Sequence, residues 1–112
     1  MIECETLPDG IARMVLNRAP VNALSAALLG EMSQKLEVLA GDDSIKAVIL
    51  SSPFRVFSAG LDLKEAQDFD ISAQHRIVRA LNVDFLNLFA FPKPTVIAVN
   101  GAAIAGGPVF VL

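Results

Sequence analysis

The sequence predicts an α/β fold in which short strands alternate with helices and pair at least partly in parallel. Residues 47–50 are a continuous apolar run with the length of a strand covered on both faces, and residues 95–99 predict a second buried strand. A helical pattern of apolar residues precedes each run. Such alternation requires crossover connections, which join parallel strands. With 112 residues, the chain corresponds to one small domain or to part of a larger one.

The first 40 residues predict a hairpin followed by a helix. Residues 2–7 and 11–17 have strand-like patterns, and the tripeptide at 8–10 is a turn signal between them. Ser25 is a suitable N-cap for a helix that extends to about Ala40. The residues expected on its buried face are Leu28, Met32, Leu36 and Leu39. Those expected to face water are Glu31, Lys35 and Glu37.

The next part of the sequence predicts a loop and two helices. The loop follows the strand at 47–50, and a short helix opens at Leu61 and extends to about Gln67. Ser72 is the expected N-cap of a longer helix, which ends before Pro92. The residues expected on the buried side of this longer helix are Ile77, Leu81, Phe85, Leu88 and Phe89.

The last residues predict an incomplete unit. After the strand at 95–99, residues 100–101 form a turn, and a helix begins near Gly107. The sequence stops within the apolar segment 109–112, with no charged last turn and no glycine cap. A hydrophobic content of 54% also indicates surfaces that more chain or further subunits would cover.

Composition excludes several classes of function. The net charge is −3 and the basic residues are scattered, so we expect no nucleic-acid partner. Cys4 is the only cysteine and has no metal-ligand spacing around it, so we expect no metal site. Residues 95–112 are uncharged, but breakers at 100–101 and 106–108 interrupt them, so we expect no membrane span. His75 has no nucleophile motif to pair with and is predicted to lie on the surface.

Two glycine-containing loops that follow predicted strands are the strongest indication of chemistry. One is Phe57–Leu63, and the other includes Ala105–Gly107. The N–H of Leu61, which follows Gly60, can point into a site, and Gly106 can supply a second N–H. Two preorganised main-chain donors stabilise an oxyanion, such as the enolate of a thioester, without any catalytic side chain.

Several motifs, in order along the chain, resemble the N-terminal part of the crotonase fold of the enoyl-CoA hydratase/isomerase superfamily. They are Asn17-Arg18, Val21–Ser25, Val48–Leu50, Phe57–Glu65 and the segment from Lys93 to Gly107. The resemblance implies a superhelical spiral of ββα turns. Residues 1–112 would form the N-terminal part of that domain, and its C-terminal part would be absent.

The resemblance also implies roles for residues of both loops. Leu61 and Gly106 match the two N–H donors of the oxyanion hole. The residues that match the loop around coenzyme A, which binds largely through its main chain, are Ser58, Ala59, Gly60, Leu61 and Asp62. Asp62 also fits the N-cap of a helix. Lys64 matches a basic residue near the coenzyme A phosphates and equally fits a solvated helix lysine.

One departure from the family pattern favours isomerisation over hydration. Hydratases of the family have a glutamate at the position of Val109, and valine cannot activate water. The residues resemble most the mitochondrial-type 3,2-trans-enoyl-CoA isomerases. The expected reaction shifts a 3-enoyl-CoA double bond to 2-trans-enoyl-CoA in fatty acid β-oxidation. The resemblance places its glutamate base in a following helix, beyond Leu112, and residues 1–112 alone are expected to be inactive. Glu31 and Glu65 fit ordinary surface residues.

Further expectations follow from the resemblance. The partner is an acyl-CoA thioester, and no cofactor is needed because coenzyme A is part of the substrate. The full-length protein would be a homotrimer or hexamer, in the mitochondrial matrix if eukaryotic and in the cytoplasm if bacterial. Two alternatives stay open: another reaction of the family, such as hydration or hydrolysis, or a non-catalytic truncated form that binds acyl-CoA or associates with subunits.

Overall fold

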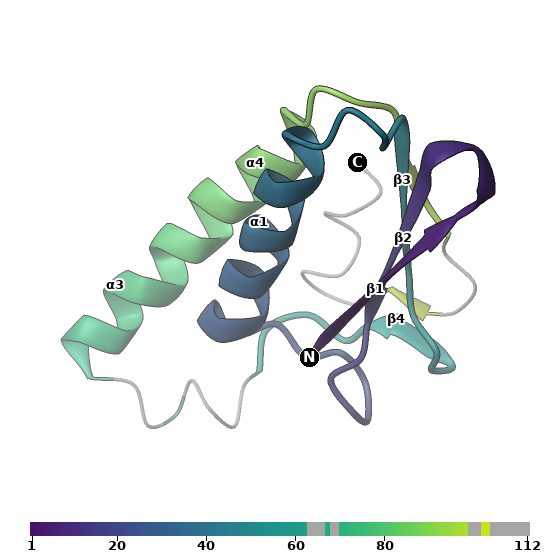
Figure 1. The fold of residues 1–112 in the computed structure, drawn as a ribbon. Coiled ribbons are helices and arrows are strands. Elements are labelled where there is room, and N and C mark those ends of the chain that lie inside the picture. Colours follow the sequence, from purple (N-terminus) through teal and green to yellow (C-terminus); the bar gives the residue numbers. More distant parts are fainter. Residues whose placement is uncertain (63–66, 68–69, 99–101, 104–112) are drawn as a thin grey trace.

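A strand–strand–helix order repeats along the chain. The structure is a computed structural model, and it describes residues 1–62, 67, 70–98 and 102–103. Two such units are followed by two more strands (Figure 1). The elements are β1 (Ile2–Leu7), η1 (Pro8–Gly10), β2 (Ile11–Leu16), α1 (Ala26–Ala40), β3 (Ala47–Ser51), β4 (Val56–Ser58), α3 (Ile71–Arg79), η2 (Ala80–Asp84), α4 (Phe85–Phe89), β5 (Thr95–Ile97) and β6 (Ala102–Ala103).

The strands form two sheets. The larger has the order β1-β2-β3-β5, in which β1 and β2 are antiparallel and the other two pairs are parallel. The smaller joins β4 to β6 in parallel. The predicted α/β class, the hairpin and the partly parallel pairing are therefore confirmed.

The turn of the hairpin holds the first strands against β3. Gly10 has a φ of 77°, and a Cβ there would lie 2.6 Å from the Ser44 carbonyl oxygen. The Gly10 carbonyl in turn accepts a hydrogen bond of 2.6 Å from the Lys46 N–H. Glycine is thus required at this position both for its backbone angle and for the close approach of the 44–46 segment.

Both ends of α1 have side-chain caps. At the start, the predicted cap is confirmed, because Ser25 Oγ accepts a hydrogen bond of 3.1 Å from the Leu28 N–H. At the end, Lys93 Nζ donates to the carbonyls of Leu39 (2.6 Å) and Asp42 (2.7 Å), which ties the helix to the segment before β5. Hydrogen bonds from the Ser44 hydroxyl and N–H lower the pKa of the Asp42 side chain in the same connection.

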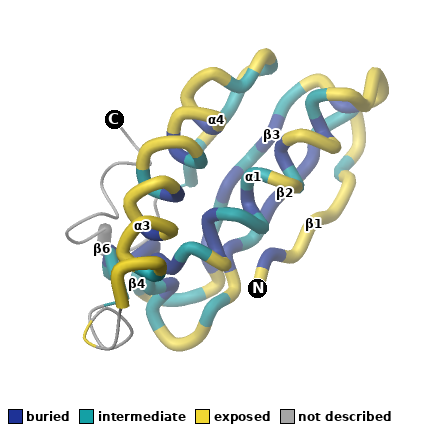
Figure 2. Tube along the Cα trace, turned by 90° about the vertical axis from the view of Figure 1, so that its left-hand side faces the viewer, coloured by how far each residue is buried: buried dark blue, intermediate teal, exposed yellow. Residues whose placement is uncertain are grey.

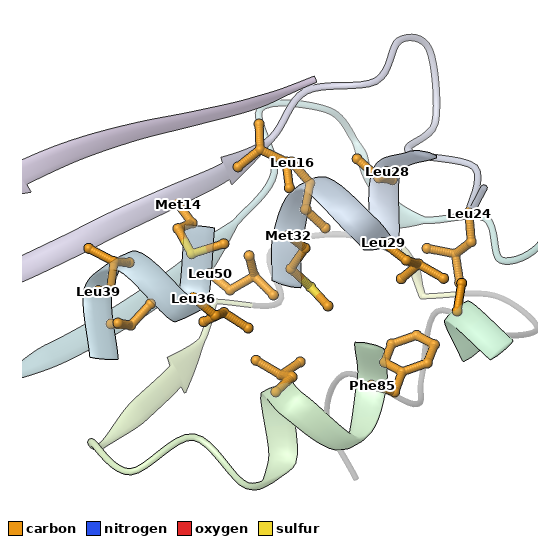
Figure 3. Close-up of a cluster of buried hydrophobic side chains, with 14 of the residues drawn as sticks. Met14, Leu16, Leu24, Leu28, Leu29, Met32, Leu36, Leu39, Leu50 and Phe85 are labelled. Atoms are coloured by element: carbon orange, nitrogen blue, oxygen red, sulfur yellow. The ribbon is translucent and has the colours of Figure 1, made fainter. Parts of the chain in front are cut away.

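The hydrophobic core lies between the larger sheet and the helices. Both views of the molecule place α1 between the sheet and the continuous helix formed by α3, η2 and α4 (Figures 1 and 2). The predicted inner face of α1 is confirmed: Leu28, Met32, Leu36 and Leu39 are all buried. Figure 3 shows them against Met14 and Leu16 of β2, Leu50 of β3 and Phe85 of α4.

The long helix differs from its prediction at its start and in its middle. Its N-cap is Asp70, not Ser72, because the Asp70 backbone is still extended and its carboxylate accepts a 2.7 Å hydrogen bond from the Ala73 N–H. The π-helical turn η2 was not predicted. Ile77 and Phe85, eight residues apart, would differ by about 80° of rotation in a straight α-helix. The wider π turn reduces that difference, and both side chains are buried.

Two predictions about helix faces are wrong. Phe89 is 51% exposed, because the buried face is centred between Phe85 and Leu88, which leaves Phe89 at its margin. Glu31 does not simply face water: it is half-buried, lies 3.5 Å from the N-terminal amine and accepts a hydrogen bond of 3.2 Å from the Ile2 N–H. It therefore connects α1 to the edge strand β1.

The predicted coverage of both faces of the strands is also wrong for the described part of the chain. In β3 only Val48 and Leu50 are buried, whereas Ile49 is half-buried. Val96 of β5 is 56% exposed. Among the described elements, α1 covers one face of the larger sheet, and the alternating burial follows from that. β5 also ends at Ile97, and Val99 lies outside the described residues.

Two short strands were not predicted, and one predicted helix begins differently. β4 falls in a predicted loop, and β6 follows the predicted turn at 100–101. Leu61 pairs with Leu24 in an isolated β-bridge and does not open a helix; residues 63–66 lie outside the description. The helix expected near Gly107 also lies outside it. No helix in the described segments has both the length and the apolar character needed to cross a membrane.

Candidate functional site

Two loops from different ββα units meet beside the smaller sheet. We call residues 17–25, between β2 and α1, the Asn22 loop, and residues 58–62, which begin at the last residue of β4, the Gly60 loop. Leu24 donates to the Gly60 carbonyl at 2.6 Å and accepts from the Asp62 N–H at 2.9 Å. A third main-chain hydrogen bond, of 3.0 Å, joins the Ala59 N–H to the Val21 carbonyl. The Gly60 loop is thus held along its length by the Asn22 loop.

This pairing fixes the direction of the Leu61 amide. In a parallel bridge, one residue bonds the two neighbours of its partner, and the partner directs its own N–H and C=O to the opposite side. Leu24 bonds the residues on either side of Leu61, so the Leu61 N–H points away from the Asn22 loop. No hydrogen bond joins this N–H to another residue in the described part of the chain.

Gly60 and Ser58 stabilise the conformation of the Gly60 loop, one through its backbone angle and the other through its buried hydroxyl. Gly60 has a φ of 82°, in the left-handed region. Its N–H donates to Ser58 Oγ at 3.2 Å, and that hydroxyl donates to the Asn22 carbonyl at 2.9 Å. Ser58 is fully buried, so its hydroxyl serves as an internal support and is already engaged as donor and acceptor.

Asn22 connects three segments around the loop. Its side chain is fully buried, and its backbone has a φ of 51°, a conformation that asparagine tolerates better than most residues. The amide nitrogen donates to Ser52 Oγ (2.9 Å) and to the Phe57 carbonyl (3.0 Å), and the amide oxygen accepts from the Arg18 N–H (2.8 Å). The sequence indicated Asn22 only as part of a motif, because two of its side-chain hydrogen bonds reach residues 30 and 35 positions away.

Arg18 connects the two loops through its side chain. Nη1 donates to the Ala23 carbonyl at 2.6 Å, and Nη2 lies 2.8 Å from Asp62 Oδ2. The two side chains are only 25% and 19% exposed. Asp62, expected to cap a helix or to lie along coenzyme A, therefore forms an ion pair with a residue of the Asn22 loop. Its neighbours at 63–66 lie outside the description, so the capping prediction stays untested.

Several predicted site residues fall outside the described part of the chain. Gly106, Lys64 and Glu65 are among them. Of the predicted donor pair, only the environment of the Leu61 amide is therefore described. A cavity of about 550 Å³ lies elsewhere, between α1 and α4, and none of its lining residues belongs to the Gly60 loop. Within the described segments, no three histidine, cysteine or acidic side chains are arranged to hold a metal ion.

Replacing Gly60 with alanine is expected to lower the free energy of unfolding by about 1–2 kcal/mol, the cost of a left-handed backbone for a residue with a Cβ. The matched control is Gly30→Ala in α1, where a new Cβ would meet no atom within 4 Å. That substitution is expected to stabilise the protein by about 0.5–1 kcal/mol through helix propensity. Urea unfolding of both variants measures the difference. Equal effects of the two substitutions would contradict the proposed role of Gly60.

Comparisons with known proteins agree on one family. The family model for enoyl-CoA hydratase/isomerase matches residues 6–112. The chain is 40% identical over 101 residues to the mouse protein "Enoyl-CoA delta isomerase 1, mitochondrial", covering 89% of this chain and 35% of that protein. It is 39% identical over 95 residues to the "2,3-dehydroadipyl-CoA hydratase" of Escherichia coli, covering 84% of this chain and 36% of the relative.

The same comparisons extend to solved structures. The crystal structure of human mitochondrial delta3-delta2-enoyl-CoA isomerase superposes with a TM-score of 0.91 at 36% identity, and covers 97% of this chain and 43% of the human one. The chain thus spans well under half the length of the relatives it matches. The predicted crotonase-like ββα architecture is confirmed by this superposition and by the repeated element order.

Proposed function

Because this chain belongs to the enoyl-CoA hydratase/isomerase family, we propose that it contributes the oxyanion-binding half of an enzyme that acts on acyl-CoA thioesters. The single observation that carries the proposal is the direction of the Leu61 amide. Its N–H points away from the Asn22 loop and has no partner among the described residues, while the amides around it are bonded. A donor held in this way is preorganised for a carbonyl oxygen.

The reaction we propose proceeds through a thioester enolate. The α-proton of a thioester is weakly acidic, and its removal becomes feasible when the developing oxyanion meets preorganised N–H donors. Leu61 supplies one donor and Gly106 the second. The main chain of Ala59, Leu61 and Asp62, which the buried residues Ser58 and Gly60 support from inside, would lie along the coenzyme A portion, and Lys64 would approach its phosphates. Coenzyme A enters as part of the substrate, so the proposal requires no separate cofactor.

Isomerisation is the specific reaction we propose. The base, a glutamate expected beyond Leu112, takes a proton from C2 of a 3-enoyl-CoA and returns one to C4, which leaves the double bond between C2 and C3. Val109 supports this choice, because its side chain cannot activate water for hydration. The 40% identity to an isomerase supports it too, although a similar identity to a hydratase keeps hydration as the second candidate.

Product analysis tests this proposal. We expect the whole protein to convert 3-enoyl-CoA to 2-trans-enoyl-CoA, and residues 1–112 alone to give no turnover because the base is missing. Liquid chromatography with mass detection separates the isomer, which has the mass of the substrate, from 3-hydroxyacyl-CoA, which is heavier by one water. Rapid formation of the hydroxy product would show a hydratase instead.

The same proposal includes a place in fatty acid β-oxidation, in the mitochondrial matrix of a eukaryote or the cytoplasm of a bacterium. It also includes assembly as a trimer or hexamer.

A further inference from the structure

We propose that the Arg18–Asp62 ion pair is a positioning device that sets the direction of the Leu61 amide during catalysis. The inference rests on the proposed function, because it concerns the same oxyanion donor. Neither side chain is assigned to the reacting atoms. Both side chains act through the main chain of residues 60–62, so they are positioning residues and not catalytic ones.

The ion pair is one of several contacts that hold the main chain on both sides of the Leu61 amide. The guanidinium of Arg18 bonds the Ala23 carbonyl with one nitrogen and the Asp62 carboxylate with another. Between these two contacts, Leu24 bonds the Asp62 N–H and the Gly60 carbonyl. Asp62 is thus held at its side chain and at its main chain by neighbouring residues of one loop. The Leu61 N–H lies in the peptide unit between Gly60 and Leu61, whose carbonyl accepts the hydrogen bond from Leu24. The contacts of Asp62 hold the next peptide unit, so a rotation that turned the Leu61 N–H would strain both sets of hydrogen bonds.

The main chain of Arg18 is held in place by hydrogen bonds to Asn22. Its N–H donates to the Asn22 side chain at 2.8 Å, and its carbonyl accepts from the Asn22 N–H at 2.8 Å. The planar guanidinium presents its donors in a rigid fork, which suits two acceptors in fixed directions. Since both side chains are mostly buried, the contact also differs from exposed ion pairs, which contribute little.

The structure offers a matched control. Arg13 and Glu5 form a second arginine–carboxylate pair across β1 and β2. Its side chains are 44% and 49% exposed, and neither residue belongs to the Asn22 loop or the Gly60 loop. Substitutions of Arg13 or Glu5 also remove an arginine–carboxylate pair, but they do not affect the loops that hold the Leu61 amide.

The test uses the whole protein with 4-(dimethylamino)cinnamoyl-CoA, whose absorption shifts to the red when its thioester carbonyl accepts strong hydrogen bonds. We expect Arg18→Met and Asp62→Asn each to diminish this red shift and to lower kcat about tenfold or more, while the dissociation constant of the probe changes less than about threefold. Arg18→Lys, which cannot hold both acceptors with one ammonium in the same geometry, should fall between wild type and Arg18→Met. Arg13→Met should match wild type.

A double variant distinguishes coupling from separate effects. If the pair acts as a unit, Asp62→Asn adds less than about twofold to the loss already caused by Arg18→Met. A full red shift and unchanged kcat in Asp62→Asn, which is nearly isosteric and can be studied even if Arg18→Met fails to fold, would overturn the inference. Absence of any red shift in wild type would instead overturn the proposed function itself.

Discussion

Replacing Asn22 with alanine is expected to lower the free energy of unfolding by about 3 kcal/mol or more. The substitution removes three side-chain hydrogen bonds that this fully buried residue forms within the described part of the chain, those to Ser52, Phe57 and Arg18. It also leaves a Cβ on a left-handed backbone without the compensating amide. The effect should exceed that of Gly60→Ala, because here lost hydrogen bonds and backbone cost act together.

Further variants at this position separate the two contributions. Asn22→Gly relieves the backbone while still losing the hydrogen bonds, so it should recover about 1 kcal/mol relative to alanine. Asn22→Asp keeps the acceptor for the Arg18 N–H but has no donors for Ser52 Oγ and the Phe57 carbonyl, so it should also be strongly destabilised. Unfolding in urea, with the linear extrapolation, measures all three.

The matched control is Asn17→Ala, which removes one exposed hydrogen bond of 2.9 Å to Glu3. It is expected to change the free energy of unfolding by no more than about 0.5 kcal/mol. If Asn22→Ala were no more destabilised than Asn17→Ala, then the Asn22 hydrogen bonds would not hold the two loops together.

Local patterns in the sequence predicted those parts of the fold that local physics decides. The hairpin of β1 and β2 has clear periodicity, and the Ser25 cap with the helix it begins depends on residues three to four positions apart. β4 and β6 have three and two residues, too few for any periodicity to show, and they exist only because they pair with each other. The choice of Asp70 over Ser72 as N-cap depends on where the preceding chain enters the helix, which spacing alone does not determine.

For the candidate site, the sequence indicated which residues take part but not how they are arranged. A glycine followed by Leu61 indicated an available amide, but the direction of that amide comes from the bridge to Leu24, in a different ββα unit. The same holds for the Arg18–Asp62 pair, whose members are 44 positions apart. Arg18 and Asp62 both stood in the recognised motifs. Only the folded chain shows that they belong to one arrangement, since the pairing of distant segments is a property of the sheet and not of either segment.

Deleting the Leu61 N–H alone is expected to lower kcat about 10²–10³-fold, the usual consequence of losing one oxyanion donor. Incorporation of the α-hydroxy analogue of leucine at position 61 replaces the amide by an ester and leaves the side chain in place. Because this N–H has no partner in the described part of the chain, its removal breaks no hydrogen bond there, and the melting temperature should change little. Turnover of 3-enoyl-CoA by the whole protein measures the loss.

Two controls make the interpretation specific to the donor. Leu61→Ala keeps the N–H and removes part of a side chain packed against the core, so it should reduce stability more than kcat. The second control is an ester at Ala73, whose N–H donates to the carboxylate of the N-cap residue Asp70 at an exposed helix start. It should leave kcat unchanged and slightly lower the free energy of unfolding. If the ester at Leu61 left kcat unchanged, the oxyanion would have to be held elsewhere, because the ester lacks the N–H that we propose as its donor.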